Sequence, residues 1–379
     1  MKRICFVVAV PITAQAFLKD HIAALSKEYE VYLVGDIKSD NEVEGLALTG
    51  WHRIKIERGI SLWRDLKAVF ASRSYFKQMK FDAVHSVTPK AGLVCALAGK
   101  MAGIKHRTHI FTGQVWATRK GVMRFILKSI DKVIARCNNH ILVDGESQRQ
   151  FLIKEGVLKP GNSQVLANGS ICGVKLERFV ISEEVRRAER EKFGFKDDDV
   201  VFIFLGRLNH DKGIGELYEA FNKLVVECPK SKLLLYGTDE EGYEAKASAY
   251  ANLKRDENFY YPGLTRKPFD ALQGGDVFVL PTWREGFGSS VIEAQALGLP
   301  VITSDAYGVV DASVPNVTGL RCGVDDPEGL YECMKRYYEH PELMKKHGEA
   351  GRKRVFELFD CNVVTKAWKK YYRRLMAEG

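Results

Sequence analysis

Two glutamates eight positions apart mark the segment of the chain that is richest in groups able to do chemistry. Glu285 opens a glycine-rich turn, and Glu293 lies in the apolar run that follows it. The pattern predicts a strand ending at residues 278–281, a loop over 282–286 and a helix over 289–297. Backbone N–H groups at the start of such a helix favour anionic or polyhydroxyl ligands. The two carboxylates can then accept hydrogen bonds from ligand hydroxyl groups. The alternative is a solvated acidic pair beside an ordinary strand, loop and helix.

A second group of charges follows the apolar run 200–205. Arg207 and Lys212 stand five positions apart between glycines, ahead of another helical stretch. A guanidinium can bind two oxygens of a diphosphate at once, and an ammonium adds a mobile point charge. Because ligands of open α/β sheets bind beyond the carboxyl ends of the strands, this spacing predicts a diphosphate clamp. The alternative is an exposed basic loop, and His210 within it is expected to be solvated.

The elements that would position these residues alternate between short apolar runs and longer amphipathic runs. Strands are predicted over residues 3–10, 30–35, 82–86, 107–111, 140–143 and 164–167, with helices over 14–27, 62–79 and 90–102. A second set of strands is predicted over residues 200–205, 232–236, 258–260, 276–280 and 300–303. This alternation is typical of doubly wound parallel sheets. We therefore expect two α/β domains with a hinge near residues 168–180.

Composition favours a large cytosolic enzyme. The chain has 379 residues, 46% hydrophobic and 28% charged, which suits two globular domains. Its eight cysteines are scattered without a C-x-x-C pair or a His/Cys cluster, so we expect reduced thiols and no structural metal. The N-terminal apolar run is too short for a signal peptide, and no run reaches the length of a membrane span.

Positive charge is concentrated in the first half of the chain. Residues 1–170 contain 26 Lys and Arg against 14 Asp and Glu, a net charge of +12, whereas the remainder has −3. This imbalance predicts an anionic partner, either a phospholipid surface or a lipid diphosphate. Nucleic acid is not expected, because no nucleic-acid-binding motif is present.

One predicted helix carries part of this charge at regular spacing. Basic residues recur every four positions at Lys120, Arg124, Lys128, Lys132 and Arg136. Apolar residues are expected on the opposing face at Val122, Phe125, Ile126, Ile130, Val133 and Ile134. Two interpretations remain open. The basic stripe, Lys120, Arg124, Lys128 and Lys132, can lie against anionic lipid, or the helix can be a surface helix whose apolar face packs on the core.

The segment 284–302 resembles the signature of family 4 glycosyltransferases, with R-E-G-F-G, the second glutamate and G-L-P-V-I in order. The sequence G-R-L-N-H-D-K-G at 206–213 resembles the donor-diphosphate motif of that family. This resemblance implies the GT-B fold, in which two Rossmann-like domains face a central cleft. It implies an acceptor domain over residues 1–170 plus a terminal helix over about 362–379, and a nucleotide-sugar domain over residues 171–361.

The resemblance also implies a set of donor contacts. Arg207 and Lys212 would offset charge on the leaving diphosphate, Glu285 would position the donor sugar, and Glu293 would hold the ribose. The remaining donor contacts are expected at Gly206, Gly237, Leu264, Gly286, Phe287, Gly288, Ser289 and Ser290. The implied donor is a UDP-sugar, and the transferred sugar is expected to be an N-acetylated hexosamine. No metal or other cofactor is expected, because the two cations would replace a divalent ion.

The acceptor side departs from the commonest family pattern. Residues 85–93 and 111–116 resemble bacterial capsule and O-antigen glycosyltransferases, which extend undecaprenyl-diphosphate-linked saccharides. Many members have a histidine where Thr112 stands, and His109 is instead expected to be a strand histidine. The implied acceptor contacts are Thr13, His85, Lys90, Thr112 and Gln114.

The function implied is sugar transfer with retained configuration to a polyprenyl-diphosphate-linked acceptor, by a peripheral protein on the inner face of the plasma membrane. Two alternatives remain. The first keeps the donor chemistry but uses a soluble acceptor. The second is a non-catalytic scaffold that binds a nucleotide or a lipid head group.

Overall fold

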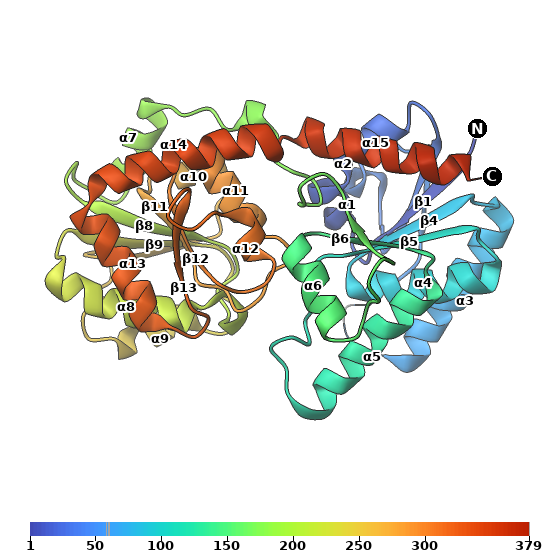
Figure 1. The fold of residues 1–379 in the computed structure, drawn as a ribbon, viewed down its shortest axis with the longest axis horizontal. Coiled ribbons are helices and arrows are strands. Elements are labelled where there is room, and N and C mark those ends of the chain that lie inside the picture. The colour runs from blue at the N-terminus through green and yellow to red at the C-terminus, as the bar shows by residue number, and fades with distance from the viewer. Residues whose placement is uncertain (58, 60, 379) are drawn as a thin grey trace. The chain divides into compact units, whose positions relative to one another are not determined.

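The computed structural model describes residues 1–57, 59 and 61–378, which form two compact α/β units. Unit 1 comprises residues 1–173 and 361–379, and unit 2 comprises residues 174–360 (Figure 1). Residue 379, the last of the expected terminal helix, lies outside the described residues. Each unit has its own parallel sheet and its own hydrophobic core.

The sheet of unit 1 has seven parallel strands in the described residues, in the order β3-β2-β1-β4-β5-β6-β7. The strands are β1 Arg3–Val7, β2 Glu30–Gly35, β3 Gly50–Arg53, β4 Ala83–Val87, β5 His106–Phe111, β6 His140–Val143 and β7 Gln164–Val165. Parallel strands bring their carboxyl ends to one edge of the sheet. The loops that follow β1, β4, β5 and β6 therefore share that edge.

Helices cover both faces of this sheet. They are α1 Pro11–Phe17, α2 Lys19–Leu25, α3 Leu62–Met79, α4 Pro89–Ala102, α5 Gly121–Cys137, α6 Glu146–Lys154 and α15 Cys361–Ala377, with a 3₁₀ turn at Asp40–Glu42. Helix α4 packs against both α3 and α5, whereas α15 packs on α2 (Figure 1). Within the described residues, no helix combines the length and apolarity needed to cross a membrane.

Unit 2 has a six-stranded parallel sheet in the order β10-β9-β8-β11-β12-β13. Its strands are β8 Val200–Leu205, β9 Ser231–Tyr236, β10 Phe259–Gly263, β11 Val277–Leu280, β12 Val301–Ser304 and β13 Gly319–Cys322. The helices are α7 Glu183–Glu191, α8 Ile214–Glu227, α9 Tyr243–Lys246, α10 Pro268–Gln273, α11 Ser289–Ala296, α12 Val309–Ala312, α13 Pro327–Glu339 and α14 Pro341–Leu358. Three 3₁₀ turns lie at Leu176–Arg178, His210–Lys212 and Ala247–Ala249.

Several predicted boundaries were wrong, and the differences have local causes. Strands β3 and β13 were not predicted, because their sequences, G-W-H-R and G-L-R-C, contain no run of apolar residues. The single helix expected over 14–27 is two helices that meet at Leu18. The first strand stops at Val7, because Pro11 begins helix α1.

Helix α15 is anchored in the core of unit 1 by stacked aromatic rings. Trp368 lies between His21, at a centroid distance of 4.4 Å, and His85, at 5.0 Å. The His85 Nδ1 and the Tyr372 hydroxyl are hydrogen bonded at 2.7 Å. Burial lowers the pKa of His21 to about 4, so this layer is uncharged at neutral pH. The last helix of the chain is thus part of the core of its first unit.

Replacing Trp368 should therefore weaken unit 1 strongly. We expect Trp368→Ala to lower the free energy of unfolding by about 3–5 kcal/mol, because it removes a fully buried indole and leaves a cavity. The exposed Val363 on the same helix provides the control, and Val363→Ala should cost less than about 1 kcal/mol. Urea denaturation of the full chain, followed by circular dichroism, measures both. Equal losses would show that the stacked layer is not the anchor.

Candidate active site

The predicted donor residues lie on loops at the carboxyl edge of the sheet of unit 2. Strands β8, β9 and β11 are neighbours, and the loops 206–213, 237–242 and 281–288 follow them. This is the edge at which open parallel sheets bind ligands. The arrangement brings together residues that are up to 80 positions apart in the chain.

Two glycines allow these loops to touch. A Cβ atom on Gly237 would lie 1.6 Å from the carbonyl oxygen of Gly206, and one on Gly213 would lie 2.0 Å from that of Pro281. Both glycines also have positive φ angles, +145° and +71°, which disfavour other residues. The close contact of the loops after β8, β9 and β11 therefore depends on glycine at these positions.

Asp211 then joins the loop after β8 to the loop after β11. Its carboxylate accepts hydrogen bonds from Arg284 at 2.5 and 3.0 Å. Its backbone carbonyl accepts from the Thr282 hydroxyl at 2.8 Å and from the Trp283 amide at 2.9 Å. This junction was not predicted from the sequence, because the residues that it joins are more than 70 positions apart and form no local motif.

The junction places Lys212 against Glu285. The two side chains form an ion pair, and both are largely buried, at 17% and 15% exposure. The predicted diphosphate cation and the predicted sugar-binding carboxylate are therefore direct neighbours. An ammonium in this position can contact an anionic leaving group while the carboxylate binds a hydroxyl group beside it.

Arg207 is held differently, by a carboxylate that the sequence did not point to. Its Nη1 lies 3.1 and 3.0 Å from the two carboxylate oxygens of Glu240, and the Asn209 amide donates to the same carboxylate at 2.7 Å. The Arg207 side chain is more than half exposed. A bound diphosphate would therefore compete with Glu240 for an accessible guanidinium.

Helix α11 begins at this edge with backbone N–H groups that no side chain caps. Its N-cap is Gly288, with a φ angle of +90°, and Ser289 and Ser290 form its first turn. Gly286 precedes it in the loop. The side chain of Phe287 packs in the core against Phe359, so the prediction that it binds donor is wrong for the side chain; only its backbone remains available. The helix start is suited to an anionic or hydroxyl-rich ligand.

Glu293 lies on α11 and is partly exposed. Desolvation of its carboxyl raises the pKa from 4.5 to about 7. No charged neighbour among the described residues contributes to this shift. A half-ionised carboxyl at neutral pH is suited to binding a pair of ligand hydroxyl groups.

Leu264 follows β10 at the side of this edge and is exposed. The neighbouring Tyr261 donates from its hydroxyl to the Gly237 carbonyl at 2.8 Å, which ties β10 to the loop after β9. The predicted donor contacts Gly237 and Leu264 therefore lie on neighbouring loops.

The structure contradicts one predicted acceptor contact in unit 1, His85, and gives a second, Lys90, an ion-pair partner. His85 is fully buried, its ring stacks on Trp368 and its Nδ1 bonds to Tyr372, so it cannot contact an acceptor as folded. Lys90 forms an ion pair with Asp65 and is largely buried. Both residues were predicted to lie at a strand-to-helix turn. In the structure, the side chain of His85 is buried in β4, and the ion-pair partner of Lys90 comes from α3.

The other acceptor candidates lie at the carboxyl ends of β1 and β5. Thr13 is buried in α1, and Thr112 is partly exposed directly after β5. Gln114 is buried, accepts a hydrogen bond from Gln148 at 3.2 Å, and its own Nε2 lacks a partner within the described residues. His109 is a buried strand histidine, as expected, and bonds to Ser86 at 2.9 Å.

Helix α5 is rotated relative to the prediction. Arg124 and Lys128 turn inward, over the ring of Trp116 at 5.1 and 5.5 Å, and both form ion pairs with Glu155. The expected basic stripe toward lipid is therefore wrong for these two residues, whereas Lys120 is exposed and Lys132 is partly exposed. The expected packing of the apolar face is also wrong at Val122, Phe125 and Ile126, which are exposed.

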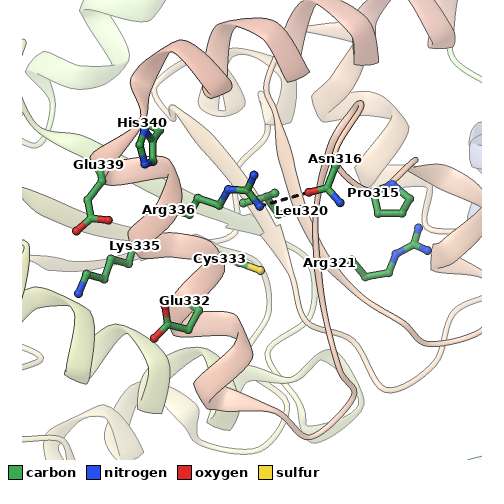
Figure 2. A pocket seen from close by; sticks show the side chains of 10 residues that line it. All are labelled: Pro315, Asn316, Leu320, Arg321, Glu332, Cys333, Lys335, Arg336, Glu339 and His340. Carbon is green, nitrogen blue, oxygen red and sulfur yellow. Dashed lines mark hydrogen bonds between the residues drawn. The ribbon is translucent and has the colours of Figure 1, made fainter.

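A cavity of about 680 Å³ lies elsewhere in unit 2, between β13 and α13 (Figure 2). Its lining mixes both charges, and Arg336 reaches Asn316 across it at 3.4 Å. Asn316 precedes β13, so this cavity includes the amino end of the edge strand rather than the carboxyl ends of β8 and β11. Within the described residues, no group of three His, Cys, Asp or Glu side chains is arranged to hold a metal ion.

Comparison with known proteins agrees with the fold. Residues 185–354 match the model of the family described as glycosyl transferases group 1, and residues 20–169 match the glycosyl transferase 4-like domain. The capsular polysaccharide biosynthesis glycosyltransferase CapM of Staphylococcus aureus is 30% identical over 340 residues, covering 90% of this chain and 87% of CapM.

A second relative is the UDP-Gal:alpha-D-GlcNAc-diphosphoundecaprenol alpha-1,3-galactosyltransferase of Escherichia coli. It is 27% identical and covers 66% of this chain and 65% of its own length. Among solved structures, HepE of Anabaena in complex with UDP-glucose has a TM-score of 0.81 at 14% identity, covering 99% of this chain and all of HepE.

Two parallel-sheet Rossmann-like units make this chain an α/β protein of the GT-B fold. The chain belongs to the group 1 family of glycosyl transferases. The family model spans the loops that carry Arg207, Lys212, Glu285 and Glu293.

The raised pKa of Glu293 predicts that ionisation of this carboxyl lowers the stability of the fold. A carboxyl whose folded pKa is raised contributes stability below its unfolded pKa of 4.5 and loses it as pH rises through about 7. The loss at higher pH is about 3 kcal/mol. We therefore expect Glu293→Gln to unfold at higher urea than the parent chain at about pH 8, and at the same urea near pH 4.5.

The control is Glu332→Gln, at an exposed position of α13, which should leave the pH dependence of unfolding unchanged. A parallel pH profile for Glu293→Gln and the parent chain would contradict the assignment.

Proposed function

We propose that the chain transfers a sugar from a UDP-sugar to a saccharide linked to a lipid diphosphate, in the assembly of a capsule, an O-antigen or another surface polysaccharide. The observation that carries the proposal is the pairing of Lys212 with Glu285 near Arg207, at the carboxyl ends of β8 and β11. The UDP-glucose in HepE supports the donor. The diphosphoundecaprenol substrate of the Escherichia coli relative supports the acceptor.

The donor diphosphate binds to the two cations. Arg207 exchanges Glu240 for diphosphate oxygens, and Lys212 turns from Glu285 toward the same group. Both cations then stabilise negative charge that develops as the bond from the sugar to the diphosphate breaks. We propose that they make a divalent ion unnecessary for this step.

The two glutamates bind the rest of the donor. Glu285, once its ammonium partner faces the diphosphate, accepts a hydrogen bond from a hydroxyl group of the transferred sugar. Glu293 receives the ribose hydroxyl groups, and these hydrogen bonds stabilise its ionised form at the expense of the neutral one. The uncapped start of α11 adds N–H donors beside them.

We propose that configuration is retained. The acceptor hydroxyl oxygen forms a bond to the anomeric carbon on the face that the diphosphate leaves. The proton of that hydroxyl passes to an oxygen of the departing diphosphate. This step consumes one donor and one acceptor and releases UDP.

The proposed location is the cytoplasmic, inner face of the plasma membrane, with the chain attached peripherally. A UDP-sugar and a lipid diphosphate would meet there, and the charge of +12 on residues 1–170 favours an anionic surface. UDP-N-acetylhexosamines and UDP-galactose are the first donors to test.

The test is a donor panel of UDP-, GDP- and ADP-sugars with and without a polyprenyl-diphosphate saccharide, in the presence of EDTA. We expect turnover of one UDP-sugar that rises sharply with the lipid acceptor, and nuclear magnetic resonance of the product should show the anomeric configuration of the donor. Loss of activity in EDTA would overturn metal independence. Transfer to soluble acceptors alone would favour the soluble-acceptor alternative, and no turnover or nucleotide binding would favour the scaffold.

The variant Lys212→Ala tests whether the candidate active site is needed for transfer. We expect kcat/KM for transfer to fall about 10²–10³-fold, because a charge aligned with the leaving group is lost. Lys223→Ala is the matched control, since Lys223 also forms a lysine–glutamate ion pair in unit 2 but on the exposed face of α8. It should retain activity within about twofold. Equal activity of the two variants would remove Lys212 from the mechanism.

A further inference from the structure

Helices α3 and α5 of unit 1, which both pack against α4, expose large apolar side chains in their first halves. Near the start of α3, Trp63 is 82% exposed and Phe70 54%, with Leu66 also exposed. Near the start of α5, Val122 is 75% exposed and Phe125 72%, with Met123 and Ile126 also exposed. Single exposed apolar residues are ordinary, but clusters on adjacent helices mark interaction surfaces. We call these two clusters together the apolar rim.

The two clusters lie at the same edge of the unit. Helix α3 follows β3 and α5 follows β5, so both helices begin at the carboxyl edge of the parallel sheet. Helix α4 packs against both of them and begins at the same edge (Figure 1). With packed helices about 8–10 Å apart, the two clusters lie within about 20 Å of each other. The apolar rim is therefore one surface on one side of unit 1.

The orientation of α5 is set from inside the unit. Trp116 is buried and donates to the carboxylate of Asp131 at 2.7 Å. Arg124 and Lys128 lie over its ring and pair with Glu155. With these cations turned inward, the first turns of the helix direct their apolar side chains outward.

The charges around the apolar rim are mainly basic. The acidic Glu57, just before α3, is paired with Arg64 and Lys55. Helices α3 and α5 contain one acidic residue each, Asp65 and Asp131, and both are engaged inside the unit, by Lys90 and Trp116. The exposed charged residues next to the apolar side chains are basic: Lys67 on α3, and Arg119 and Lys120 just before α5. A second copy of the chain would meet this surface with like charge, whereas anionic lipid offers both apolar depth and negative charge.

We infer that the apolar rim inserts into the surface of an anionic bilayer, with Lys67, Arg119 and Lys120 at the head groups. Trp63 suits the interfacial layer, where amphipathic aromatic rings are preferred. The inference deepens the proposed function, on which its biological meaning rests, but the binding itself requires no turnover. It replaces the basic stripe of α5 as the lipid contact. It also places the carboxyl edge of unit 1, with Thr112 and Gln114, at the side from which a lipid-linked acceptor would arrive.

Vesicle co-sedimentation of the full chain tests this inference. The probes are vesicles of phosphatidylcholine alone and of phosphatidylcholine with about one third phosphatidylglycerol. We expect binding to the anionic vesicles that weakens with salt. The double variants Val122→Ser/Phe125→Ser and Trp63→Ser/Phe70→Ser should each lower the partition coefficient about tenfold or more. Lys67→Gln/Lys120→Gln should lower it only for anionic vesicles.

Val226→Ser provides the control, because Val226 is an exposed apolar residue of α8 in unit 2, and it should bind as the parent chain does. Binding that survives both apolar double variants would overturn the inference. So would a lack of binding together with self-association in sedimentation that the same variants abolish, which would assign the surface to a dimer.

Lys212→Ala separates this inference from the proposed function. It should bind vesicles like the parent chain even though transfer is lost. If no donor is turned over but the apolar variants still lose vesicle binding, the proposed function fails and the membrane surface stands. If donor turnover on a short-chain soluble acceptor analogue is normal but vesicles are not bound, the membrane surface fails alone.

Discussion

The contact between the loops after β8 and β11 is the constraint on which the candidate active site depends. Asp211 bonds to three consecutive residues of the second loop, Thr282 to Arg284. Gly213 allows the backbones to approach. Because Lys212 and Glu285 are the next residues along each loop, their pairing is a direct consequence of this junction. Arg207 and Lys212 each have a carboxylate partner, so the proposed donor diphosphate would bind by exchange with Glu240 and Glu285.

Glu293, at the same edge of the sheet, differs from Glu240 and Glu285 because no cation in the described part of the chain is paired with it. Desolvation raises the pKa of its carboxyl to about 7, so its ionised form is held at a cost to the stability of the fold. Glu240 and Glu285 do not carry this cost, because they are paired with Arg207 and Lys212. The candidate site therefore combines two carboxylates that are paired with cations and one whose pKa is raised by desolvation.

Unit 1 is organised around buried aromatic side chains. Trp368 joins α15 to the sheet by stacking between two histidines, and this removes His85 from any role at the surface. Arg124 and Lys128 of α5 lie over the ring of Trp116, and the apolar residues at the start of that helix therefore point outward. Contacts with a buried indole therefore hold α15 in the core of the unit and set the orientation of α5.

The strand and helix pattern, and the motifs that carry Arg207, Lys212, Glu285 and Glu293, could be predicted from sequence, because hydrophobic periodicity and short spacings are local properties. The edge strands β3 and β13 were missed, since glycine and polar residues interrupt their apolar residues. Three results came only from the tertiary structure: Glu240 at Arg207, the burial of His85, and the rotation of α5. Each depends on a partner distant in sequence, and a helical repeat specifies which residues share a face but not which face meets the core.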